Sequence, residues 1–431
     1  MCWLLLPLLQ LSTGRPIPDS LLGLSEIAWA PSFTICSASE GPLAGCTNAT
    51  RTGRQCLGPS FYLGTPSVVR SPTTGNLLAT ADLFDHGPSA ACWPHFFVAH
   101  RDHGWAKWQR NATLYRSSDN GSTWKWRGWV PQHYWSSLFA HEGAVYLMGV
   151  TDDKHGEPKI SRTTDDGLTW TQAVLRSDGL RYTTGATAVA FAQGRVWRAY
   201  EGGPDRASMM FSAPASADLL DPTAWRRTAP LAFNLSWIPE SFGPVVKPTQ
   251  PWVEGNVVQG PDGRMYNLLR LESGWSVTKP VANKALLLRL PEGASDSEES
   301  ADTPALEYVS IVDMPGGSSK FTVRRHTSGV YFALTNNVTN VSACCSARNV
   351  LTLVSSRDLR TWKIQDTLLV SDEGLTEEDA WRYTAFSYVD WQFDGDGIIY
   401  AMRTSYRGGV SFHNTNRITF RVLEGIGRYL E

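Results

Sequence analysis

Short apolar runs that alternate with turn signals predict β-hairpins along most of this chain. The clearest pairs of runs span residues 62–82, 135–150, 186–200, 252–270 and 384–403, and each pair is joined by a turn that contains Gly. Runs of this length, separated by Gly, Pro, Asn or Asp, are typical of strands. Amphipathic helical periodicity is scarce. The pattern therefore predicts an all-β protein built from successive hairpins.

A repeated octapeptide indicates how the hairpins are organised. Residues 117–124 read SSDNGSTW and residues 163–170 read TTDDGLTW, so both follow the pattern hydroxyl, x, Asp, x, Gly, x, Thr, Trp. A third copy at 355–362 has lost the Gly, and residues 212–225 are a more distant relative. In such a turn Asp accepts backbone N–H groups, Gly adopts a positive φ and Trp packs on the strands behind. Internal repeats of strand-rich units predict a β-propeller.

The octapeptide resembles the Asp-box, or BNR repeat, of the sialidase (neuraminidase) superfamily, whose members are six-bladed β-propellers. In that family the box is structural and lies away from the active site, so the resemblance implies a fold and assigns no chemistry. A chain of 431 residues accommodates six blades of about 70 residues each. We therefore expect an all-β, six-bladed, sialidase-like β-propeller over residues 59–431, preceded by an irregular Cys-containing segment at residues 15–58.

The N-terminal segment and the cysteine count predict export. Residues 1–14 form a short apolar core followed by Ser-Thr-Gly, which is typical of a signal peptide because a membrane span needs roughly 20 residues. Without Cys2 the cysteines are even in number and permit up to three disulfides: Cys36, Cys46, Cys56, Cys92, Cys344 and Cys345. Six asparagines lie in N-x-[ST] sequences that permit glycosylation: Asn48, Asn111, Asn120, Asn234, Asn337 and Asn340. We expect a secreted or lumenal glycoprotein with no stable membrane span.

Charge and composition exclude some partners. The 39 basic residues nearly balance 41 acidic residues and form no basic stripe, so nucleic-acid binding has no support. No cysteine spacing resembles a zinc site, and we expect no metal and no cofactor. The 18 tryptophans suit blade packing in the main, and some of them suit stacking on sugar rings.

Sialidase chemistry requires a particular set of side chains. A retaining glycosidase needs a nucleophile and an acid/base group, and in sialidases the nucleophile is Tyr. Because the ordinary pKa of Tyr is about 10, a neighbouring carboxylate must act as its base. A substrate that carries a carboxylate is best bound by Arg, whose planar fork pairs with two oxygens. The set is therefore Tyr, Glu, Asp and several arginines.

The resemblance to sialidases implies roles for four residues of this chain. Sialidases carry a Glu at a strand start and an Arg sixteen positions later across an Asp-Gly turn, and Glu254 and Arg270 match this spacing. Arg348 fits the family arginine before the strand that enters a late Asp-box. Tyr388, in Tyr-Val-Asp upstream of an Asp-Gly turn, fits the nucleophile, with Glu254 as its base. Arg403 is a further candidate for the cleft and has no family counterpart.

The first blade departs from the family pattern. Gly64 stands where sialidases place an arginine two positions before a Pro, so the first carboxylate-binding arginine is missing. Arg70 is a poor substitute, because six residues along a strand place it about 20 Å away. The loss removes about 1.5–3 kcal/mol of substrate binding. The acid/base Asp is expected just beyond the returning strand, where Asp82 and Asp85 both qualify and His86 is a possible helper.

The resemblance to sialidases implies an exo-acting glycoside hydrolase that removes terminal acidic sugars, sialic acid or a related sugar, from glycoconjugates with retention. Two alternatives remain. One is a carbohydrate-binding propeller that kept the scaffold and lost catalysis at Gly64. The other is a hydrolase of the sialidase clan that acts on a different sugar, such as an arabinan or a uronate polymer. Turnover and product analysis separate the three.

Overall fold

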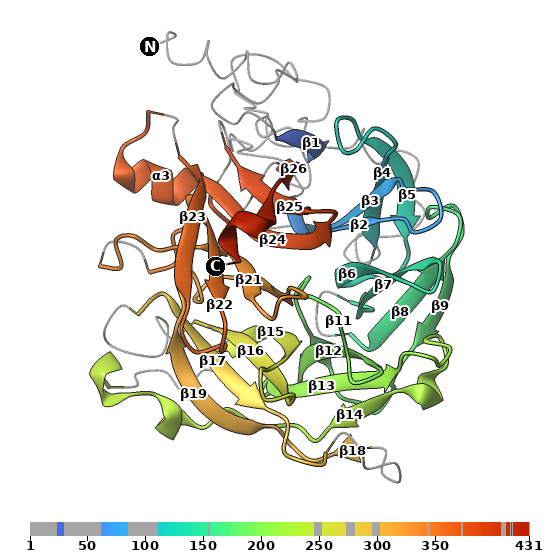
Figure 1. Ribbon diagram of the computed structural model, residues 1–431, viewed down its shortest axis with the longest axis horizontal. Coiled ribbons are helices and arrows are strands. Elements are labelled where there is room, and N and C mark those ends of the chain that lie inside the picture. Colours follow the sequence, from blue (N-terminus) through green and yellow to red (C-terminus); the bar gives the residue numbers. More distant parts are fainter. Residues whose placement is uncertain are drawn as a thin grey trace, which may run out of the picture.

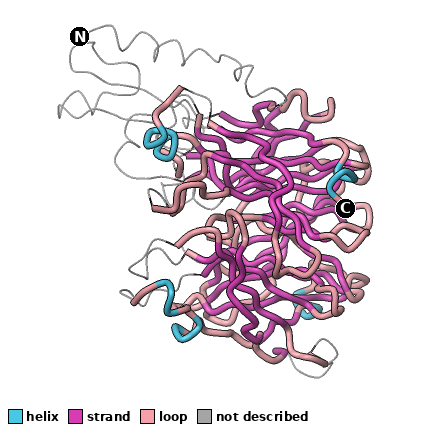
Figure 2. The backbone as a smooth tube through the Cα atoms, turned by 60° about the vertical axis from the view of Figure 1, so that its left-hand side comes forward, coloured by secondary structure: helices cyan, strands magenta, loops and turns pink. Residues whose placement is uncertain are grey.

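Six β-sheets surround a central axis in the computed structural model of this chain, as Figure 1 shows. The structure describes residues 24–29, 62–84, 111–152, 156–244, 252–272, 281–294, 302–342, 345–371, 374–406, 411–413, 415 and 417–430. Strands dominate the described residues, and the few helical segments lie at the margins (Figure 2). The prediction of an all-β, six-bladed propeller is confirmed.

Blades 1, 2, 4 and 5 are four-stranded meanders in which the first strand lies nearest the axis. Blade 1 contains β2 (Tyr62–Arg70), β3 (Leu77–Phe84), β4 (Ala112–Ser117) and β5 (Lys125–Val130). Blade 2 contains β6 (Tyr134–His141), β7 (Ala144–Val150), β8 (Pro158–Thr163) and β9 (Thr171–Val174). Blade 4 contains β15 (Trp252–Gln259), β16 (Met265–Leu271), β17 (Lys284–Arg289) and β19 (Glu307–Asp313). Blade 5 contains β20 (Thr322–Arg325), β21 (Tyr331–Asn336), β22 (Val350–Ser356) and β23 (Lys363–Val370).

Blade 3 departs from the simple meander. Its inner edge consists of two short strands, β10 (Tyr182–Thr183) and β11 (Ala190–Ala192), which both pair with β12 (Arg195–Gly202). The sheet continues through β13 (Ala207–Pro214) and β14 (Arg226–Thr228), and β18 (Asp302–Thr303) adds to β14 in parallel. The acidic stretch at 291–304 therefore contains a short strand near its end. The inner edge of blade 3 is open between residues 183 and 190.

The last blade closes the ring with the start of the chain. It contains β24 (Ala385–Asp394), β25 (Gly397–Ser405) and β26 (Arg417–Leu423), and its outermost strand is β1 (Ser25–Trp29), antiparallel to β26. The prediction that residues 15–58 are irregular is wrong for these five residues, because their pairing partner lies at the other end of the chain. The rest of that segment and the predicted signal peptide lie outside the described residues.

Hydrophobic clusters fill the six spaces between neighbouring blades. One cluster joins blades 2 and 3, and another joins blades 6 and 1 with help from β1. Because a middle strand of a blade faces a neighbouring sheet on both sides, it is buried along its whole length, as β16 and β22 are. This explains why the sequence shows continuous apolar runs in place of strict alternation.

Three Asp-boxes close the turns between the third and fourth strands of blades 1, 2 and 5. In the first, Asp119 accepts the Thr123 N–H at 2.9 Å and the Thr123 hydroxyl at 2.6 Å, and the Trp124 indole donates to the Gly121 carbonyl at 3.1 Å. In the worn copy Leu359 replaces the Gly and still adopts a φ of 64°. The boxes lie at the outer parts of the blades, as the resemblance implied.

Two remaining predictions concern export. Among the described residues no helix is both long and apolar enough to cross a membrane. Of the six cysteines, all but Cys345 lie outside the described residues, so the disulfides stay a prediction.

Candidate active site at one end of the axis

Four inner strands carry a β-bulge at the same place near their beginnings. The register shifts after residue 64 of β2, 134 of β6, 253 of β15 and 387 of β24. In each bulge one residue other than Gly has a positive φ: Thr65 (21°), Trp135 (48°), Glu254 (61°) and Tyr388 (55°). A bulge re-aims a side chain, and left-handed residues other than Gly cluster at functional sites. Because all inner strands run in the same direction, the four bulges lie at the same end of the axis.

The second strands place charged residues opposite these bulges. Asp82, Arg270 and Arg403 each pair with the residue that precedes the bulge residue of their own blade, and Glu201 takes the equivalent position in blade 3 opposite β10. All four side chains are buried. The bulge position of the inner strand and the facing position of the second strand thus supply most of the acidic and basic side chains at this end of the axis.

Glu254, Arg270 and Tyr388 come together from blades 4 and 6. Arg270 Nη1 donates to Glu254 Oε2 at 2.9 Å and to the Tyr388 hydroxyl at 3.3 Å. Arg270 Nε donates to the Ser318 carbonyl at 3.1 Å, and Nη2 pairs with Glu272. The guanidinium therefore joins the proposed base and the proposed nucleophile through one nitrogen.

Two further arginines face the ring of Tyr388. The guanidinium carbon of Arg403 lies 4.4 Å from the ring centroid, and that of Arg348 lies 5.3 Å from it. Arg348 is also 5.2 Å from the ring of Phe412, and two of its nitrogens, Nε and Nη1, have no hydrogen-bond partner among the described residues. Arg403 on β25 therefore places a third guanidinium at the phenol, although Gly64 leaves the first blade without one.

Arg70 is not part of this cluster. It lies at the far end of β2 and forms a bidentate pair with Asp394, at 2.5 and 2.7 Å.

The charges around Tyr388 oppose one another. Burial raises the pKa of Tyr388, the Glu254 carboxylate raises it further, and Arg270, Arg348 and Arg403 lower it. Burial lowers the pKa of Arg403 to about 10. For Arg270 the effect of burial is outweighed by Glu254 and Glu272, which raise its pKa. The three arginines thus oppose the rise in the pKa of Tyr388 that burial and Glu254 cause.

The two acid/base candidates have different outcomes. Asp82 is buried on β3, and its Oδ2 accepts the Trp135 N–H at 3.0 Å, so one carboxylate oxygen holds the bulge of blade 2. Asp85 and His86 lie outside the described residues. The choice between Asp82 and Asp85 stays a prediction.

Several buried charges near the axis escaped the sequence analysis. Arg198 is fully buried, and its Nη2 donates to the carbonyls of Trp135 at 3.1 Å and Gly185 at 2.9 Å. Lys320 donates to the Val389 carbonyl at 2.6 Å, and burial lowers its pKa to about 8. A signal for Arg198 and Glu201 was present, since both are charged residues within a strand whose other residues after Arg195 are uncharged, RVWRAYEG.

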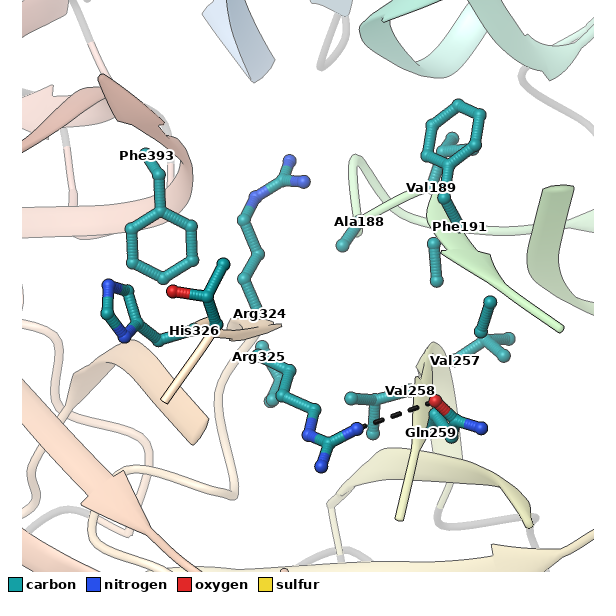
Figure 3. Close-up of a pocket in the computed structure, with 14 residues that line it drawn as sticks. Ala188, Val189, Phe191, Val257, Val258, Gln259, Arg324, Arg325, His326 and Phe393 are labelled. Carbon is teal, nitrogen blue, oxygen red and sulfur yellow. Dashed lines mark hydrogen bonds between the residues drawn. The ribbon is translucent and has the colours of Figure 1, made fainter. Parts of the chain in front are cut away.

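A cavity of about 380 Å³ lies elsewhere on the axis. Its lining includes Val257, Arg324 and Phe393, which are close to the ends of β15, β20 and β24, so it opens opposite to the bulges. Figure 3 shows Arg325 turned toward Gln259, with Arg324 pointing into the space between the strands. This cavity is separate from the Tyr388 cluster. In the described part of the chain no three His, Cys, Asp or Glu side chains gather as metal ligands.

The ring of six blades defines a sialidase-like β-propeller. No family model and no curated protein matches the sequence. Among solved structures, a Hadza microbial sialidase matches with a TM-score of 0.51 and 11% identity, over 84% of this chain and 66% of that chain. A mutant α-L-arabinofuranosidase from Fusarium graminearum, in complex with an iminosugar inhibitor, matches with a TM-score of 0.51 and 11% identity, over 85% and 95%. These likenesses establish the fold and leave the substrate open.

Proposed function

We propose that this protein is an exo-acting glycoside hydrolase that releases a terminal acidic sugar, sialic acid or a related sugar, with retention. The observation that carries the proposal is the bridge from Glu254 through Arg270 to Tyr388, with two more arginines at the phenol. The predicted leader and glycosylation sites support a secreted or lumenal location, where glycoconjugates are the expected partners.

The charge balance of the cluster favours an anionic substrate. Arg270, Arg348 and Arg403 bring three positive charges, and Glu254 and Glu272 bring two negative charges to the same guanidinium of Arg270. A carboxylate on the substrate neutralises the surplus. The two unpaired nitrogens of Arg348 are suited to bind it, because charge-assisted Arg–carboxylate pairs are strong. A neutral arabinofuranoside has no group that needs three guanidinium groups.

In the proposed reaction, Tyr388 attacks the anomeric carbon while Glu254 accepts the phenolic proton. The glycosidic C–O bond breaks as a Tyr–sugar bond forms, and the Asp at position 82 or 85 donates a proton to the departing oxygen. Water then attacks the same carbon and gives a proton to the Asp, while the Tyr388 oxygen leaves and recovers its proton from Glu254, so that the sugar is released with retention. The arginines stabilise the phenolate and counteract the effect of burial on its pKa.

Fluorogenic glycosides of sialic acid, a uronic acid and arabinofuranose test this function. We expect hydrolysis of an acidic glycoside by the wild type and a loss of about a thousandfold or more in Tyr388→Phe. The matched control is Tyr383→Phe, since Tyr383 is exposed on the helix α3 (Glu377–Tyr383). Full activity of Tyr388→Phe refutes the nucleophile. Hydrolysis of the arabinofuranoside alone indicates the alternative hydrolase, which acts on a sugar other than an acidic one. Glycan binding without turnover indicates a carbohydrate-binding propeller.

A further inference from the structure

Blade 3 brings a buried acid to Glu254 that the reaction above does not use. Glu201 on β12 is fully buried. Its Oε1 accepts the Gly255 N–H at 3.0 Å, and its Oε2 has no hydrogen-bond partner among the described residues. Buried polar atoms are normally paired, so a carboxyl kept here with one oxygen unpaired has a role other than general stability. The bond that it does make is to the backbone beside the proposed base.

The backbone at Glu254 needs such a contact. Its φ of 61° is in the left-handed region, which a residue other than Gly keeps only where the surroundings hold it. Successive N–H groups in such a bulge point the same way and form a concavity for an oxygen. Burial raises the pKa of Glu201 to about 7, and the amides of Gly255 and Glu254 both oppose this rise. Both amides of the bulge thus act on the Glu201 carboxyl, and an oxygen of either protonation state can accept the bond from Gly255.

Packing leaves the bulge little freedom. A Cβ on Gly255 would lie 2.4 Å from Asn267 Oδ1, and a Cβ on Gly185 would lie 3.0 Å from Glu254 Cγ. Close packing on both sides therefore confines Glu254, while Glu201 holds its backbone. The charged groups that act on Glu201 are Glu254, Arg206 and Arg198.

The same construction occurs a second time in the ring. Asp82 takes the position in blade 1 that Glu201 takes in blade 3, and it accepts the N–H of Trp135 in the bulge of blade 2 at 3.0 Å. In both cases an acid on a second strand binds the bulge of the next blade. This repetition indicates that the contact between the acid and the backbone N–H stabilises the bulge.

We propose that Glu201 is a positioning residue: its carboxyl holds the bulge that turns Glu254 toward Arg270 and Tyr388. The proposal rests on the proposed function, in which Glu254 is the base. Substrate does not touch Glu201 in this arrangement, so its loss reduces kcat and leaves KM almost unchanged.

Three substitutions in the full chain separate position from charge. Glu201→Leu removes the acceptor, Glu201→Gln keeps an acceptor oxygen without charge, and Glu201→Asp keeps the charge but withdraws it by one methylene. Each variant is measured by amide hydrogen exchange of residues 252–259 and by kcat and KM on the best acidic glycoside. We expect exchange to rise roughly 10- to 100-fold and kcat to fall about as much in Glu201→Leu, with Glu201→Gln close to wild type. Glu307→Gln, on the outermost strand of blade 4, is the control and changes neither.

Each outcome decides the proposal. Unchanged exchange in Glu201→Leu overturns it, and so does faster exchange with an unchanged kcat. If Glu201→Leu does not fold, the order of the other two variants decides, because positioning requires Gln to exceed Asp in kcat and in protection. A wild type without turnover refutes the proposed function separately, and the exchange data then show on their own whether Glu201 holds Glu254 in its bulge.

Discussion

Replacing Arg348 by Met is expected to stabilise the free protein while it weakens the binding of an acidic sugar. Arg348 is buried at the end of the loop before β22, and burial lowers the pKa of its guanidinium. Its Nε and Nη1 have no partner among the described residues. Buried guanidinium nitrogens of this kind are suited to bind an anion, because charge-assisted bonds to it satisfy both nitrogens.

The magnitude follows from the contacts. Each unpaired buried N–H costs about 1–3 kcal/mol, and an apolar side chain of similar length removes both costs. The substitution also removes the cation–π contacts with Tyr388 and Phe412, worth about 0.5–2 kcal/mol each. The net expectation is a gain of about 1–2 kcal/mol in the free energy of unfolding. Loss of the charge-assisted bonds weakens sugar binding by about 1.5–3 kcal/mol, or roughly 10- to 150-fold.

Two measurements test whether stability rises while sugar affinity falls. Urea denaturation without ligand gives the free energy of unfolding, and calorimetry in the Tyr388→Phe background gives the affinity for a sugar with and without a carboxylate. Arg382→Met is the control, since Arg382 is an exposed residue of α3 and changes neither quantity by much. An Arg348→Met protein that is less stable than wild type without ligand contradicts the reasoning, because the guanidinium would then be satisfied within the protein.

Three further predictions concern stability. Gly121→Ala should destabilise the protein by about 2–4 kcal/mol in urea denaturation, because Gly121 has a φ of 87° and its new Cβ would lie 2.1 Å from the ring of Phe420. The control Gly75→Ala should cost only about 1 kcal/mol, because Gly75 has a similar φ of 73° but open space around it. Asp390→Ala should cost about 3–5 kcal/mol, since its buried carboxylate accepts two bonds from β2 and pairs with an arginine of β20, and an unchanged urea midpoint would show that the ring closes without it. Burial raises the pKa of Glu201 from 4.5 to about 7 in the folded state, so the folded state binds more protons and stability falls as pH rises from about 4.5 to 7. Comparison with Glu201→Gln between pH 5 and 8 should isolate a loss of about 2–3 kcal/mol, and parallel pH profiles would refute it.

The fold was predictable from local signals, because a propeller repeats a local unit. The Asp-boxes and hairpins each depend on contacts between residues close in sequence, so their patterns are visible without knowledge of the whole. β1 was not predictable in this way. Its five residues have no hairpin partner nearby, and they pair with β26, which the chain reaches only after five complete blades.

The candidate site was predictable where a family spacing exists within one hairpin. Glu254 and Arg270 belong to β15 and β16, and their separation along the chain places Arg270 opposite Val253, the residue before Glu254. That Arg403 supplies a guanidinium where Gly64 supplies none could not be predicted, because it depends on the closure of the ring, which brings blade 6 beside blade 1. Glu201 was missed for the same reason, since it acts on a residue of the next blade.

Blade 3 contributes to this site because its inner edge is not a continuous strand. Its inner edge is interrupted between β10 and β11, at the level where four other blades place a bulge. Gly185 lies in this interruption, with its α-carbon so close to Glu254 that a Cβ would come within 3.0–3.5 Å of three carbon atoms of that side chain. A bulged strand with a side chain here would compete with Glu254 for the space beside the axis. The gap in blade 3 accommodates the side chain of Glu254, the proposed base. Arg198 donates to the Gly185 carbonyl and Glu201 accepts the Gly255 N–H, so blade 3 helps to position Glu254 of blade 4.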